Sequence, residues 1–223
     1  ILENVQFVIA TPENHHDSII HMLENREIKN YRCIDSKLEA ALMEKYYSTS
    51  GEFLSLHSLN KGEAKASLSV YMSKFYKDQA LKGEYKLSDW IHPLQAGAAL
   101  TDIRVAALQD NEGDNISYKN VNYSELTAMY WIAKHTDDEY LGLFHYRRIL
   151  DVTEEDLYRF IENDIDVILP YPTIHYPNIY EHHKRYLKEA DWKTMLQVLN
   201  ECAPSYMEKL PNIFQGQYFY NYN

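Results

Sequence analysis

Residues 145–148 have the clearest chemical potential in the chain, because they read His145, Tyr146, Arg147 and Arg148 directly after the apolar run 140–144. Two guanidinium groups at a strand end can hold a diphosphate through paired, charge-assisted hydrogen bonds. A histidine beside them can act as a base, a metal ligand or a hydrogen-bond donor. The same residues could instead form ion pairs at the end of the strand, so the pattern alone leaves a binding role and a structural role open.

Two further polar groups are expected near the same place. Ser73 and Lys74 follow a β-rich run at 67–72, and a polar loop at 110–122 leads into the start of a helix. Free backbone amides at a helix start favour anions. Ligands of an open α/β sheet bind beyond the carboxyl ends of its strands. The three groups are therefore predicted to meet at one anion-binding edge.

The segments that must position these groups alternate between strand and helix patterns. Short β-rich runs are predicted as strands at 5–10, 31–34, 67–72, 90–94, 140–144 and 165–170. Helices are predicted between several of them, and a mostly helical tail is predicted from residue 179. This order is typical of a mostly parallel sheet flanked by helices.

One predicted helix comes directly before the strand that ends at the 145–148 group. It is predicted to begin at Asn122, with Glu125 reaching back to complete a capping box. Its shared face is expected to consist of Leu126, Met129, Tyr130 and Ala133.

The chain is predicted to divide near residue 65. Residues 1–65 hold two strand–helix pairs and a linker, and they resemble the later part of a Rossmann-like unit. No activity is assigned to them. Residues 66–223 carry every candidate site residue.

Composition limits the classes of partner. The hydrophobic fraction of 45% supports a folded core, and the net charge of −11 argues against a nucleic-acid partner. The two cysteines lie far apart in sequence, which fits a reduced cytoplasm, and no apolar run approaches the roughly 18 residues of a membrane span. The 20 tyrosines suit a sugar-handling surface, but they also suit an ordinary core and surface.

Residues 95–148 carry a set of motifs in a specific order. They include Gln95-Ala96-Gly97-Ala98-Ala99-Leu100, Gly113-Asp114-Asn115-Ile116-Ser117, Asn120, Asn122-Tyr123, Glu125-Leu126-Thr127-Ala128, Tyr130-Trp131 and Gly142-Leu143-Phe144-His145-Tyr146-Arg147-Arg148. Over residues 67–223 the chain resembles the DUF4422 family of bacterial capsule and O-antigen gene clusters, which is described as glycosyltransferase-like. The family's Gly-His-Met-Phe-Asn-like motif corresponds to residues 216–221, where Gln217 replaces the histidine. The end of the family domain is expected to lie beyond this chain.

The resemblance implies a GT-A-like fold that moves a sugar from a nucleotide-sugar donor, expected to be a UDP-hexose, to a lipid-linked or growing surface polysaccharide. A lipid-linked acceptor would place this cytoplasmic protein in peripheral contact with the inner membrane. In that fold a strand-end Asp-x-Asp commonly holds a divalent metal. The one such motif here, residues 164–166, stands at the start of a predicted strand. The arginines are therefore expected to neutralise the diphosphate, and the use of a metal is left open.

The resemblance also implies roles for individual residues. Catalytic roles are expected for His145 and Asp114, with His182 as a further candidate base, although the adjacent pair His182-His183 is not expected to chelate a metal. Glu125 could instead only cap its helix. The alternative function is an inactive, transferase-like scaffold module of a capsule-synthesis complex. The residues expected to bind the donor are Ser73, Lys74, Gln95, Gly97, Asn115, Asn120, Glu125, Arg147 and Arg148.

Overall fold

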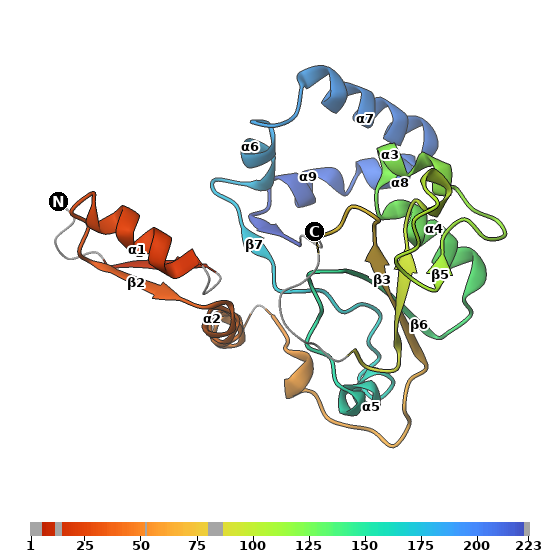
Figure 1. Cartoon of the computed structure of the whole chain (residues 1–223), viewed down its shortest axis with the longest axis horizontal. Helices are drawn as coiled ribbons and strands as arrows, with labels where there is room; N and C mark the ends of the chain where they lie inside the picture. The colour runs from red at the N-terminus through yellow and green to blue at the C-terminus, as the bar shows by residue number, and fades with distance from the viewer. Residues whose placement is uncertain (1–5, 12–14, 52, 80–86, 221–223) are drawn as a thin grey trace. The chain divides into compact units, whose positions relative to one another are not determined.

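The computed structural model of the chain describes residues 6–11, 15–51, 53–79 and 87–220. The chain folds as two compact units, Ile1–Ser58 and Leu59–Asn223 (Figure 1). The sequence placed the boundary near residue 65. In the structure, residues 59–66 belong to the second unit, where the Gly62 amide donates to the Tyr158 carbonyl at 2.8 Å.

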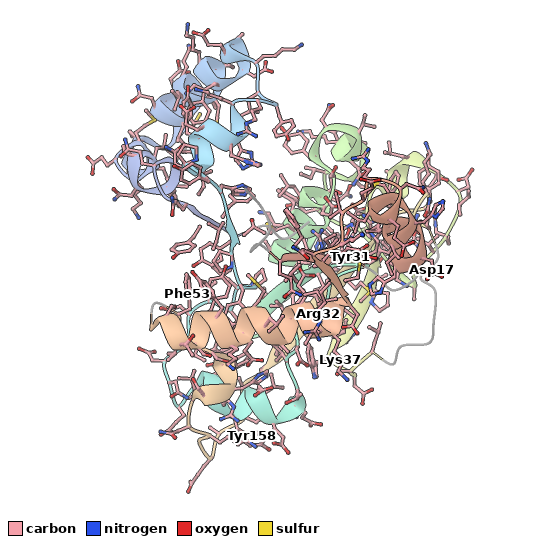
Figure 2. The ribbon with its side chains drawn as sticks, turned by 90° about the vertical axis from the view of Figure 1, so that its left-hand side faces the viewer. Asp17, Tyr31, Arg32, Lys37, Phe53 and Tyr158 are labelled. Carbon is pink, nitrogen blue, oxygen red and sulfur yellow. The ribbon has the colours of Figure 1, made fainter. Side chains whose placement is uncertain are left out.

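In the described part of the first unit, two strands and two helices follow one another in the order predicted. They are β1 (Phe7–Ala10), α1 (His16–Glu24), β2 (Tyr31–Ile34) and α2 (Ser36–Ser50), followed by the short 3-10 helix η2 (Leu56–Ser58); the label η marks 3-10 helices throughout. β1 and β2 pair in parallel, and Val5, the start of the first predicted run, lies outside the described residues. Asp35 caps α2 by accepting a hydrogen bond from the Leu38 amide at 2.6 Å. Figure 2 shows Lys37 near that end of α2 and Phe53 beyond the other.

The second unit is built on a four-stranded parallel sheet. Its strands are β3 (Leu68–Lys74), β4 (Ile91–Gln95), β5 (Leu108–Gln109) and β6 (Tyr140–His145), in the order β5-β4-β3-β6. Tyr71 packs with Leu94 and Trp131 in one core cluster, and Met72 packs with Phe144 in the other. β3 is thus covered on both faces, as expected for a central parallel strand. The predicted α/β sheet is confirmed.

The helix predicted from Asn122 is broken in two, so its predicted start is wrong. The structure has η3 (Ala98–Leu100), η4 (Ser117–Lys119), α3 (Asn120–Tyr123) and α4 (Leu126–His135). Ser124 separates α3 from α4 with a positive φ of 46°. Asn122 lies within α3, and Glu125 at the N-cap of α4 makes no side-chain capping bond.

The face of α4 that packs on the sheet also differs from the prediction. The buried residues are Thr127, Ala128, Trp131 and Ile132, whereas Leu126 and Met129 are exposed. A buried hydrogen bond from Thr127 fixes the start of the helix, described below. The bond requires Thr127 to face the buried Asp110, so the packed face consists of Thr127 and the residues that share its side of the helix.

The predicted strand at 165–170 is also wrong. The segment follows η5 (Glu154–Asp156) and α5 (Leu157–Phe160) and has no regular structure. Its alternating apolar residues satisfy the strand pattern, but Val167 is 67% exposed and the described strands do not pair with it. A strand needs a hydrogen-bonded neighbour as well as a pattern.

The predicted helical tail is confirmed. It comprises α6 (Ile179–His183), α7 (Glu189–Cys202), α8 (Pro204–Met207) and α9 (Leu210–Phe214). A short antiparallel pair that the sequence did not predict, β7 (Thr173–Ile174) with β8 (Tyr218–Phe219), brackets these helices. Within the described part of the chain, no helix is both long and apolar enough to cross a membrane.

Candidate functional site

The carboxyl edge of the sheet gathers residues from three strand ends. Ser73 on β3 lies in register with His145 on β6, and Lys74 lies in register with Gln95 on β4. Because all four strands are parallel, these ends meet at one edge, where α/β sheets bind ligands. The structure therefore brings together Ser73, Lys74, Gln95 and the 145–148 group.

His145 faces a carboxylate. Its Nε2 lies 3.8 Å from Oε1 of Glu125, and the two side chains are 14% and 33% exposed. Burial lowers the pKa of His145, and the nearby Arg147 and Arg148 lower it further against the opposing pull of Glu125 and Asp78. His145 is therefore held neutral near pH 7.

The backbone after His145 selects which ring nitrogen carries the proton. The Arg147 amide donates to Nδ1 of His145 at 3.3 Å, and the Arg148 amide donates to the His145 carbonyl at 3.0 Å. Since Nδ1 accepts, the neutral ring carries its proton on Nε2, the atom that faces Glu125. At 3.8 Å the two groups face each other at more than hydrogen-bonding distance.

The two arginines present their charge to solvent. Both are exposed, and the Arg147 guanidinium lies over the Tyr146 ring at 5.1 Å from its centroid. Among the described residues, neither Arg147, Arg148 nor Lys74 forms an ion pair. Of the 145–148 group, His145 alone faces a carboxylate within the described residues, and the two arginines form no ion pair there.

A buried carboxylate that the sequence analysis missed holds the adjacent loops in place. Asp110 is fully buried at the end of β5. One of its oxygens accepts from the Ala98 amide at 3.0 Å and the Ser117 hydroxyl at 2.5 Å. The other accepts from the Gly97 amide at 2.8 Å and the Thr127 hydroxyl at 2.6 Å. Asp110 thus ties the loop after β4 to the start of α4, and with it Glu125.

Gln95, Gly97 and Asn120 shape this loop. The Gln95 amide donates to the Ile103 carbonyl at 2.8 Å, and its oxygen accepts from the Val105 amide at 2.9 Å. Asn120 donates to the Ser124 carbonyl at 2.7 Å. Gly97 has a φ of 64°, and a Cβ there would lie 2.7 Å from Cγ of Asn120. These contacts position the loop, and direct donor binding by the three residues stays a prediction.

Asp114 lies beside α4, whereas Asn115 lies in the loop that Asp110 secures, where its side-chain oxygen accepts from the Ser117 amide at 3.2 Å. Asp114 accepts from the Tyr130 hydroxyl at 3.0 Å and lies 3.7 Å from Lys134 Nζ. With about 1.5 Å of rise per helical residue, those partners stand roughly 8 to 13 Å along α4 from Glu125. Asn115 donates to the Gly113 carbonyl at 2.8 Å. The structure therefore does not bring Asp114 to His145, and their joint catalytic role is not favoured.

The Asp-x-Asp motif lies at the opposite edge of the sheet. Asp164 occupies a turn with a φ of 51°. Burial raises the pKa of Tyr140, and the nearby carboxylates of Glu139, Asp164 and Asp166 raise it further. Tyr140 begins β6 and stands about 16 Å from His145 at roughly 3.3 Å per strand residue, so the motif lies nearer the start of this strand than its end. Within the described residues, no group of three or more metal-ligating side chains could hold a metal ion.

His182, the further candidate base, belongs to a separate cluster. Its ring centroid is 4.0 Å from that of His175, which in turn is 5.5 Å from that of His183. Burial and the two neighbouring imidazoles lower the pKa of His175. This cluster sits on α6 and at the end of β7, not at the carboxyl edge of the sheet.

Comparison with known proteins assigns the chain to a family. A family model described as a domain of unknown function, DUF4422, matches residues 78–223. The chain belongs to the DUF4422 family. No curated protein matches it.

The chain is also similar to a solved structure of a protein whose class of activity is known. The apo structure of WbbM, a bifunctional glycosyltransferase, is similar with a TM-score of 0.55 and 26% sequence identity. The match covers 69% of this chain and 32% of WbbM, so the chain spans about a third of that protein. The fold of this DUF4422 member is therefore glycosyltransferase-like, as expected from the sequence.

Proposed function

We propose that this DUF4422 chain transfers a sugar, expected to come from a UDP-hexose, to a lipid-linked or growing surface polysaccharide. The supporting observation is the set of three cations, Lys74, Arg147 and Arg148, at the carboxyl edge of the sheet without ion-pair partners among the described residues. In a protein of net charge −11, unneutralised cations at this edge suit an anionic ligand. A nucleoside diphosphate is an anion of that kind, and guanidinium groups match its oxygens.

In this proposal, charge stabilisation at the leaving group supplies most of the catalysis. As the bond between the sugar C1 and the diphosphate oxygen breaks, negative charge grows on the diphosphate, and the nearby cations stabilise it. The hydrogen bonds around His145 fix the main chain of Arg147 and Arg148, from which the two guanidinium groups extend.

Glu125 is the proposed base. It is more exposed than His145, and the Nε2 proton of His145 faces its carboxylate. Glu125 takes the proton of the acceptor hydroxyl while that oxygen forms its bond to the sugar C1. This assignment replaces the earlier expectation of Asp114 as a catalytic partner, because Asp114 lies along α4 beside Tyr130 and Lys134.

A thermal-shift panel tests the proposal. The ligands are UDP, GDP, CDP and UDP-sugars, with and without magnesium or manganese, on the wild type, Arg147→Ala and Arg32→Ala. Arg32 is an exposed arginine of the first unit and serves as the matched control. A ligand at 100 times its dissociation constant stabilises the folded state by about 2.7 kcal/mol.

We expect one nucleotide to stabilise the wild type and Arg32→Ala but not Arg147→Ala. Equal stabilisation of all three proteins would refute the placement of the donor at residues 145–148. Failure of every nucleotide to stabilise the wild type would favour the scaffold module instead.

A further inference from the structure

The segment between β7 and α7 exposes large apolar side chains. Tyr176 is 80% exposed and Tyr186 is 76% exposed, and Ile174, Tyr180 and Leu187 are also exposed. Isolated apolar side chains are common on protein surfaces. Five lie within one stretch of 15 residues, 174–188, and exposed apolar side chains gathered in this way are typical of an interaction site. We call this stretch the 174–188 surface.

The same stretch is locally basic although the protein is acidic. It contains Lys184, Arg185 and Lys188, all exposed, and Glu181 is its single carboxylate. Lys184 pairs with Glu181 and also lies over the Tyr180 ring, 5.9 Å from its centroid. Among the described residues, Arg185 and Lys188 form no ion pair. The 174–188 surface therefore carries a formal charge of +2 (three cations minus one carboxylate) in a chain whose net charge is −11.

The backbone beneath this surface is held firmly, so the exposed side chains are not simply those of a loose loop. The His175 amide donates to the Gln217 carbonyl at 2.8 Å, and the Ile179 amide donates to the Gly216 carbonyl at 2.9 Å. Ile179 is buried, and Asn178 caps α6 by accepting from the Glu181 amide at 2.8 Å. The exposed tyrosines and cations thus project from a fixed base.

Tyrosine and leucine beside lysine and arginine suit the boundary between lipid and water. Tyrosine is enriched at the boundary between lipid and water, where its ring lies among apolar groups and its hydroxyl stays hydrated. Lysine and arginine next to such rings are attracted by anionic headgroups. We propose that the 174–188 surface docks the protein on an anionic lipid bilayer. This binding stands independently of the proposed transfer reaction.

Vesicle flotation tests the proposal directly. The whole chain is mixed with vesicles of phosphatidylcholine alone or of phosphatidylcholine with phosphatidylglycerol, at low and high salt. We expect binding to the anionic vesicles only, and we expect it to weaken at high salt because the attraction is screened.

Two variants, each with a matched control, locate the contact. Lys184→Glu/Arg185→Glu is compared with Lys37→Glu/Lys45→Glu, which makes the same charge change on exposed positions of α2. One cation near an anionic surface strengthens binding about fivefold, so the first variant is expected to bind at least about 25-fold more weakly, and the control to bind like the wild type.

The second variant, Tyr176→Ser/Tyr186→Ser, removes the two most exposed rings. Its control, Tyr118→Ser/Tyr206→Ser, removes rings that are also well exposed on the second unit. We expect only the first to lose binding, with unchanged thermal midpoints by circular dichroism in both. Equal flotation with neutral and anionic vesicles, no flotation at all, or equal losses in a variant and its control would each overturn the proposal.

Discussion

Replacing Asp110 by asparagine is the most demanding test of how the site is held together. The substitution keeps the size of the side chain and changes one carboxylate oxygen into an amide NH₂ group. Asp110 is fully buried and accepts four hydrogen bonds, two on each oxygen. The kept oxygen can still accept two of them. The new NH₂ group must face a backbone amide, which cannot reverse its role as a donor.

The cost follows from this count. Two bonds to a charged acceptor are lost, each contributing about 1.5 to 3 kcal/mol, and a hydroxyl that rotates to accept from the NH₂ group recovers part of the loss. We therefore expect the unfolding free energy of the second unit to fall by about 3 to 5 kcal/mol. With about 2 to 4 °C per kcal/mol for a domain of this size, its melting temperature should fall by at least roughly 6 °C.

Urea unfolding of wild type and variant measures this change. The matched control is Asp102→Asn, since Asp102 is an exposed aspartate in the loop that Asp110 secures. We expect the control to lie within about 0.5 kcal/mol of the wild type, as surface substitutions usually do. A loss below about 1 kcal/mol for Asp110→Asn would refute the idea that this carboxylate organises the loops around the site.

Three further predictions concern single residues of the site. Glu125→Gln should lower kcat by about 10²- to 10⁴-fold and leave nucleotide affinity nearly unchanged, which turnover and titration calorimetry would measure, and a normal kcat would exclude Glu125 as the base. The pKa of His145 should lie below its ordinary value near 6.5. This histidine should therefore make the folded state less stable as the pH falls from about 6.5 toward the lowered pKa. An NMR titration that gives a pKa at or above 6.5 would contradict this. Gly97→Ala should destabilise the protein by about 2 to 4 kcal/mol in urea unfolding, because the new Cβ would lie 2.7 Å from a side-chain atom. The control is Gly51→Ala, at a similar φ with open space around it, which should lower the unfolding free energy by only about 1 kcal/mol. Equal losses in the two variants would contradict the predicted clash.

The order of strands and helices could be predicted because each element shows its own local pattern. The β-rich segments of β2, β3 and β6 are bounded by polar residues, and Asp35 is a typical helix cap. The meeting of Ser73, Lys74 and His145 also followed from the sequence, because parallel strands share a carboxyl edge.

What the sequence could not supply depends on contacts between distant segments. Asp110 looks like any other acidic loop residue, and only the fold shows that it is buried among donors from three segments. The same contacts end α3 at Ser124 and set which face of α4 is buried. The segment 165–170 has a strand pattern, but whether a neighbouring strand is available is a property of the whole sheet.

The placement of Asp114 is a further such case. The family motif suggested a role at the reacting centre, yet the loop folds along α4 and places this carboxylate beside Tyr130. Trp131 helps to fix that path, since its indole donates to the Glu112 carbonyl at 3.0 Å. Asp114 and His145 thus belong to the same set of family motifs, but the fold places Asp114 beside Tyr130.

The central claim is that the carboxyl edge of the sheet binds the diphosphate of a nucleotide. A crystal structure of the chain with UDP tests it most directly. We predict that the diphosphate lies within hydrogen-bonding distance of Arg147 or Arg148, with Lys74 facing the same group. A nucleotide bound at the opposite edge, near Asp164, with the 145–148 group unoccupied, would contradict the account.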